Sequence, residues 1–136
     1  MCIKKFSAIS ALSIATVLAL SSPTSAADED RVTVRTELQV AMQRHVDRNL
    51  IEGVVLHVDL ESGDLMELYP TTAHPMIMAS DEYFIVRADL VDAEGGQFDV
   101  DYYMAETDRG YKVIRTEIDN RSDLKELVGA GLVAQY

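Results

Sequence analysis

The chain has 136 residues, enough for one small domain, and it carries 12 basic against 23 acidic side chains, a net charge of −11. Nucleic-acid binding depends on neutralising phosphates, so this acidity argues against a nucleic-acid partner, and an anionic membrane surface is disfavoured for the same reason. A strongly acidic chain instead attracts cations, cationic ligands or a basic partner, or simply gains solubility.

Residues 1–26 have the pattern of a secretory signal peptide. A positively charged start precedes an apolar run over residues 6–20, and small residues follow up to Ala26. The apolar run is about 15 residues long, which is too short to cross a bilayer comfortably. We therefore predict cleavage after Ala26 or Ala27, a periplasmic or secreted location, and a protein without a membrane anchor.

Loss of this segment changes the chemistry of the remaining chain. Lys4 and Lys5 are removed and no acid is, so residues 27–136 carry 10 basic and 23 acidic side chains, a net charge of −13. Cys2, the one cysteine of the sequence, is removed as well. Residues 27–136 therefore contain neither a thiol nor a disulfide, and we expect a single small domain that its core alone stabilises.

The first predicted element of this domain is an amphipathic helix over residues 34–51. Apolar side chains recur at spacings of three and four, and Gly53 marks the end of the helix. Thr36 with Gln39 fits a capping box at the start, and Thr33 is an alternative start. Arg44 and Arg48 are expected on its outer face. The positions that share the predicted inner stripe are Leu38, Ala41, Met42, His45, Val46 and Asn49.

A hairpin is predicted next, from residues 54–60 and 65–69. A two-residue turn at residues 62–63 would place Leu60 opposite Leu65. Both faces of this hairpin contain apolar side chains. We therefore expect the second face of the sheet to be covered by the C-terminal segment, by a pocket or by a second copy of the chain.

Three further strands, residues 83–91, 98–105 and 111–118, form a predicted meander. Residues 76–78, which follow two prolines, are either a short strand or a buried loop. A short helix is expected after residue 122. The predicted fold class is thus α+β, with an N-terminal helix packed on a mostly antiparallel five-stranded sheet (hairpin plus three-strand meander) and a short C-terminal helix.

The two faces of the predicted meander differ in chemistry. One face is apolar and is the expected core: Phe84, Val86, Ala88, Leu90, Phe98, Val100, Tyr102 and Met104. The other face is charged, and it either binds a small charged ligand through its arginines or is a solvated face with cross-strand ion pairs. We select as candidate ligand-binding residues His57, His74, Arg87, Tyr103 and Arg115.

Motifs for catalysis and for metal binding are missing from the sequence. It contains no Gly-x-Ser-x-Gly, no His-Glu-x-x-His and no phosphate-binding glycine loop. Its histidines, His45, His57 and His74, lie 12 and 17 residues apart, which is not a ligand-like spacing. We therefore predict no catalytic residue, no metal and no cofactor.

The order of elements resembles the PAS-like Cache domains, which are extracytoplasmic ligand sensors. The resemblance depends on a long helix that runs into Val54-Val-Leu-His-Val-Asp-Leu-Glu-Ser-Gly-Asp64, then His74-Pro75, then three meandering strands. It implies a pocket bordered by the His74-Pro75 loop. The chain departs from the family in having only about 13 residues between hairpin and meander, little room for pocket-covering helices. The paired strands of residues 98–118 also resemble an NTF2-like or cystatin-like fold.

These observations predict an exported, non-enzymatic module that binds a small ligand or a protein partner. One alternative is a structural or self-associating periplasmic protein, with the second sheet face as a homodimer interface. Another is a small hydrolase or isomerase that uses a buried acid, for example Asp101 or Asp89 beside Tyr103.

Overall fold

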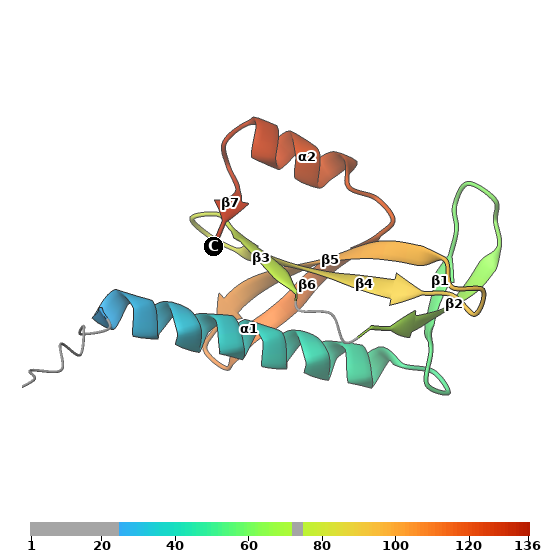
Figure 1. Cartoon of the computed structure of the whole chain (residues 1–136), viewed down its shortest axis with the longest axis horizontal. Helices are drawn as coiled ribbons and strands as arrows, with labels where there is room; N and C mark the ends of the chain where they lie inside the picture. Colours follow the sequence, from blue (N-terminus) through green and yellow to red (C-terminus); the bar gives the residue numbers. More distant parts are fainter. Residues whose placement is uncertain (1–24, 72–74) are drawn as a thin grey trace, which may run out of the picture.

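The computed structural model describes residues 25–71 and 75–136, and it has the α+β architecture expected from the sequence. Helix α1 (Ala26–Asn49) runs along one side of an antiparallel sheet, and helix α2 (Ser122–Gly129) lies on the other side (Figure 1). The strands are β1 (Val55–Val58), β2 (Leu65–Pro70), β3 (Met76–Ala79), β4 (Phe84–Val91), β5 (Gln97–Thr107), β6 (Gly110–Ile118) and β7 (Ala134–Gln135).

The meander β4–β5–β6 forms the centre of the sheet, as predicted. All of β4 pairs with residues 97–104 of β5, and β6 pairs with the far side of β5. On the other edge of β4, β2 and β3 follow one another: β2 pairs with Leu90 and Val91, and β3 pairs with residues 84–87. β1 pairs with β2 and β7 pairs with β3, both antiparallel, so the sheet has seven strands rather than the predicted five.

Helix α1 begins at Ala26, eight residues before the predicted start. Asp28 and Glu29 stabilise its first turn, where the helix dipole favours negative charge. The predicted capping box is wrong, because Thr36 lies inside the helix and its hydroxyl donates a hydrogen bond to the carbonyl oxygen of Val32 at 2.9 Å. The helix ends at Asn49, and Gly53 adopts φ +88° in the turn that follows.

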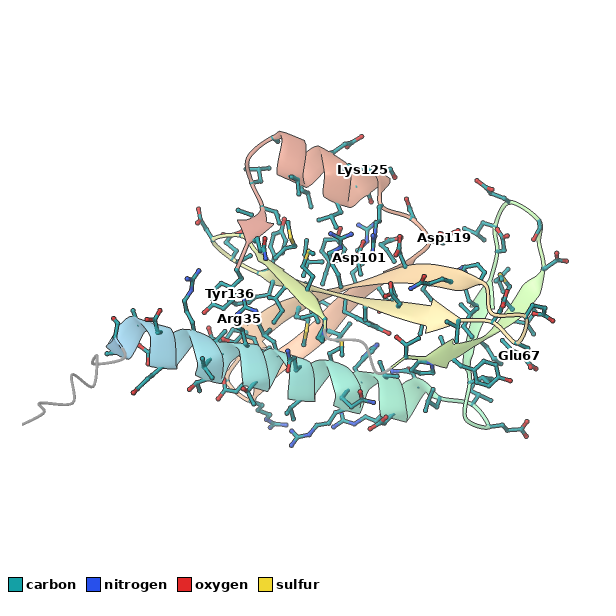
Figure 2. All side chains as sticks on the ribbon, in the orientation of Figure 1. Arg35, Glu67, Asp101, Asp119, Lys125 and Tyr136 are labelled. Atoms are coloured by element: carbon teal, nitrogen blue, oxygen red, sulfur yellow. The ribbon has the colours of Figure 1, made fainter. Side chains whose placement is uncertain are left out.

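Residue Tyr136, beside β7, packs against the first half of α1. The guanidinium carbon of Arg31 lies 5.1 Å from the centre of the Tyr136 ring and that of Arg35 lies 5.6 Å from it. Arg35 also donates a hydrogen bond to the main-chain oxygen of Tyr136, and the two residues meet between α1 and the sheet (Figure 2). The ring of Phe84 packs edge-on against Tyr136 at 5.2 Å between centroids.

The β1–β2 hairpin has a different register from the predicted one. Val58, not Leu60, lies opposite Leu65, because the loop is six residues long and spans Asp59 to Asp64. The Asp59 carboxylate accepts a hydrogen bond from the Glu61 backbone N–H at 2.9 Å at the start of this loop. A shift of two residues keeps every side chain on its predicted face, since side chains alternate with period two.

The main core lies between α1 and the sheet. The eight expected core positions of β4 and β5 are confirmed: five are buried, and Phe84, Ala88 and Phe98 are partly buried against them. From α1, the stripe supplies Leu38, Met42 and Val46, whereas Asn49 is exposed. The buried members of this cluster are Leu38, Met42, Val46, Leu68, Ile77, Val86, Leu90, Val100, Tyr102, Met104 and Tyr111.

A second, smaller core covers the other face of the sheet. Ile85 and Tyr103 from the sheet pack with Leu124 of α2, and Met78 and Val133 complete the cluster. Of the three covers that the sequence suggested for this face, the structure has the C-terminal segment over β3, β4 and β5, whereas the same face of the β1–β2 hairpin is exposed.

The structure also bears on membrane insertion. Within residues 25–71 and 75–136, no helix combines the length and the hydrophobicity that crossing a bilayer requires.

Replacing Leu38 by alanine is expected to destabilise the protein by about 2–5 kcal/mol, because its fully buried side chain would leave a cavity between α1 and the sheet. Val32→Ala is the matched control, since Val32 lies on the same helix and is 63% exposed; it should cost less than about 0.5 kcal/mol. Urea unfolding of both variants gives the two numbers, and equal losses would contradict the packing described above.

Candidate functional site

A buried carboxylate, Asp101, lies on the α2 side of the sheet. Its side chain is 1% exposed, and Figure 2 shows it between the sheet and α2. One carboxylate oxygen lies 3.4 Å from Nε of Arg87 on β4, and the other lies 3.7 Å from Nε of Arg121, the residue before α2. Arg121 also pairs with Asp99 at 2.9 Å. These ion pairs connect the entry of α2 to two strands of the sheet.

Asp101 is poorly solvated for an ionised group. Its Oδ1 and the Nε atoms of Arg87 and Arg121 are buried and have no hydrogen-bond partner in the described chain. Burial raises the pKa of Asp101 above its ordinary value, although Arg121 and Arg87 act in the opposite direction. Keeping this carboxylate ionised therefore costs folding free energy, which the two guanidinium groups offset only in part.

A second set of charges continues the same face toward the edge of the sheet. Arg115 on β6 donates hydrogen bonds to Glu117 at 2.6 Å and to Asp123 of α2 at 2.8 Å, and its guanidinium lies 5.8 Å from the centre of the Tyr103 ring. We call the whole set the Asp101 cluster: Arg87, Asp99, Asp101, Arg115, Glu117, Arg121 and Asp123. Its three cations face four acids, so the cluster has a net charge of −1 and its ion pairs link the start of α2 to the sheet.

The five predicted ligand-binding residues are only partly brought together. Arg87, Tyr103 and Arg115 share the face under α2, but both arginines are engaged by acids of the same chain. His57 lies apart on the hairpin, in a groove of about 540 Å³ that shares only Glu117 with the Asp101 cluster. His74 lies outside the described residues.

A groove that the sequence did not single out runs between α1 and β6. Its volume is about 520 Å³. One wall is a face of α1, the other is the start of β6 with the turn before it, and apolar side chains lie between the charged ones. We call it the basic groove, and it is lined by Thr36, Glu37, Val40, Ala41, Arg44, His45, Arg48, Arg109, Gly110, Tyr111, Lys112 and Val113.

The charge of the basic groove is opposite to that of the chain as a whole. Arg44 and Arg48 lie one helical turn apart on the α1 wall, and Arg109 and Lys112 lie on the β6 wall. Glu37 is the one acid among the lining residues, and with Glu106 it contributes to the raised pKa of Tyr111, of which burial is the largest cause. None of the four cations forms an ion pair with any residue of 25–71 or 75–136.

His45 is the histidine of the basic groove. Its ring packs edge-on against Tyr102, with 6.0 Å between the centroids. Burial and the neighbouring Arg48 lower the pKa of His45 below its ordinary value, so the free protein holds this ring neutral at pH 7. The sequence placed His45 on the inner stripe and Arg44 and Arg48 on the outer face, but it contained no signal that β6 would lie beside them.

The described residues offer no place for a metal ion: among 25–71 and 75–136, no three His, Asp or Glu side chains are arranged to hold one.

Comparisons with models of protein families, with curated proteins and with solved structures give no match.

Replacing Asp101 by asparagine tests the cost of the buried charge. Because burial raises the pKa of Asp101 in the folded protein, ionisation stabilises the unfolded state more than the folded state. The stability of the wild type relative to Asp101→Asn should therefore fall as the pH rises from about 3.5 to 7. Urea unfolding across this range measures the trend, and Asp81→Asn, an exposed site outside the cluster, controls for the lost charge. A relative stability that rises with pH would refute the assignment.

Proposed function

We propose that the protein is an exported, non-enzymatic binding module whose basic groove takes an anionic ligand. The observation that carries the proposal is the set of four cations, two on each wall, without a partner acid in the described chain. In a segment with a net charge of −13, four of its ten basic side chains gather in one groove. Such a concentration of like charge has an electrostatic cost, which a bound anion would remove.

The lining of the groove favours an organic anion over a bare inorganic ion. Arginine presents donors that match carboxylates and phosphates, and Lys112 supplies a further donor. Between the cations, Val40, Ala41 and Val113 offer apolar surface for a carbon skeleton. Val40 is 43% exposed, although it lies in the middle of the helix. A ligand that combines negative charge with apolar parts would satisfy both kinds of surface.

The Asp101 cluster is the weaker candidate for the same role. Its arginines already contact Asp99, Asp101, Glu117 and Asp123, so an anion would have to displace acids of the same chain. The groove under α2 that Tyr103 and Arg115 border, about 420 Å³, is also lined by Asp123 and Glu126, which repel an anion. An acid-dependent hydrolase or isomerase stays an untested prediction.

The proposed export rests on residues 1–26, whose charged start and apolar run are typical of a signal peptide. In the periplasm or outside the cell, a small module of this kind would meet anionic metabolites and acidic segments of other proteins.

Replacing Arg48 by glutamate should weaken binding of benzene-1,3-disulfonate at least about tenfold, because one cation becomes an acid at the wall of the groove. Calorimetric titration gives the affinities. Lys125→Glu, an exposed site on α2 with the same change of charge, is the matched control and should bind like the wild type. An equal loss in both variants, or no binding by the wild type, would contradict the proposal.

Binding of the disulfonate should also strengthen as the pH falls from 7.5 to 5.5. The free protein holds the His45 pKa below its ordinary value, and an anion in the groove would raise it, so protonation and binding assist each other. The sulfonates keep their charge over this range. The variant His45→Gln should lose the pH dependence, and a wild-type affinity independent of pH would exclude His45 from the site.

Self-association is the second candidate function, and the hairpin favours it. Leu56, Val58, Leu65 and Tyr69 share one face of β1–β2 and are 37%, 49%, 64% and 40% exposed. The exposed Glu67 lies opposite Leu56 on the same face, and the apolar side chains around it form a patch on a two-stranded edge, which is typical of an interface.

Sedimentation equilibrium tests this second candidate. The wild type should form dimers at high concentration, and Val58→Lys should shift the equilibrium toward monomer about tenfold, whereas Leu132→Lys, at a 61% exposed site outside the hairpin, should not. A strict monomer at every concentration would exclude self-association through this face.

A further inference from the structure

The β6 wall of the basic groove is the open edge of a strand. Five consecutive residues, 109–113, line the groove, although the side chains of a strand alternate between two faces. Consecutive residues can all border one groove when it runs along the edge of the strand. β6 pairs only with β5, so the edge of the sheet that faces the groove has no partner strand among the described residues.

This edge offers backbone hydrogen bonds to a ligand. Thr107 and Gly110 flank a two-residue turn, so their pair exchanges hydrogen bonds across the hairpin. In an antiparallel pair such residues alternate with residues whose N–H and C=O groups point away from the partner strand. In β6 the outward groups belong to Tyr111 and Val113.

The length of the groove fits a short extended segment. Along α1 the lining residues run from Thr36 to Arg48, which is about 18 Å at 1.5 Å per residue. An extended chain of about five residues covers the same distance at about 3.3 Å per residue.

The stretch of β6 that could pair with an added strand ends at a β-bulge. The register between β5 and β6 shifts between Tyr103 and Met104, which leaves Ile114 as an extra residue on β6. Ile114 is 64% exposed, and beyond it Arg115 turns toward α2. Regular pairing from the start of β6 therefore stops after Val113, close to the end of the groove.

We propose that the occupant of the basic groove is an extended acidic segment of a partner protein, about five residues long, that pairs with β6 as an added strand. This inference rests on the proposed function, because it assigns the anionic ligand of the same groove. Acidic side chains of the segment would contact Arg44 and Arg48 on one wall and Arg109 and Lys112 on the other. Apolar side chains between them would pack on Val40.

The peptide acetyl-Glu-Val-Glu-Val-Glu-amide is the probe of this inference. Its binding to the wild type should be at least about tenfold tighter than that of a copy N-methylated at both valines, since methylation removes donors of the added strand. Hydrogen exchange at the Tyr111 and Val113 amides should slow with the peptide and not with benzene-1,3-disulfonate. Arg48→Glu and Lys112→Glu, on opposite walls, should each weaken binding of the peptide, and circular dichroism verifies that both variants fold.

The possible results separate this inference from the proposed function. If the disulfonate binds in an Arg48-dependent manner while N-methylation of the peptide has no effect, the edge is not used and this inference fails alone. If neither probe binds, the proposed function fails with it. If the wild type self-associates and Arg48→Glu abolishes that association, the occupant is a second copy of the chain, and the assignment to a partner protein is overturned.

Discussion

The meander β4–β5–β6 must bury both of its faces, and this constraint shapes the rest of the molecule. Val86, Val100 and Met104 on one face require a cover, and the Leu38, Met42 and Val46 stripe of α1 provides it. Ile85 and Tyr103 on the other face require a second cover, and α2 provides that with Leu124. A domain of about 110 residues buries a smaller share of its surface than a larger domain does, so both helices contribute substantially to its core.

The two helices that cover the sheet differ in whether ion pairs join them to it. α2 is short, and it contacts the sheet through Leu124 and through the Asp101 cluster, in which arginines and acids of the same chain pair with one another. α1 is long and is held by apolar packing and by the contacts of Arg31 and Arg35 with Tyr136. Because apolar contacts hold α1, the arginines of its outer flank are not needed for its attachment, and they stand beside the edge of β6.

Local sequence patterns predicted the elements whose residues determine their own conformation. The apolar alternation of β4 and β5 identified both strands and their core faces, and the residues between strands marked the turns. The sequence did not predict three features: the start of α1, the loop at Asp59 and strand β7. Each depends either on a contact between residues distant in sequence or on a hydrogen bond that leaves no periodic pattern. Tyr136 meets Arg35 across 101 positions, and β7 has only two residues. The basic groove was not predicted either, because its two walls, residues 36–48 and 109–113, are distant in sequence.

The bulge at Ile114 bears on aggregation of the protein through its sheet edge at high concentration. A regular edge strand can template the addition of one copy after another until fibrils form. In β6 the extra residue interrupts the ladder after the first few pairs, and Arg115 adds a charge just beyond it. The regular part of this edge is therefore short, and a short edge is a poor template for repeated strand addition.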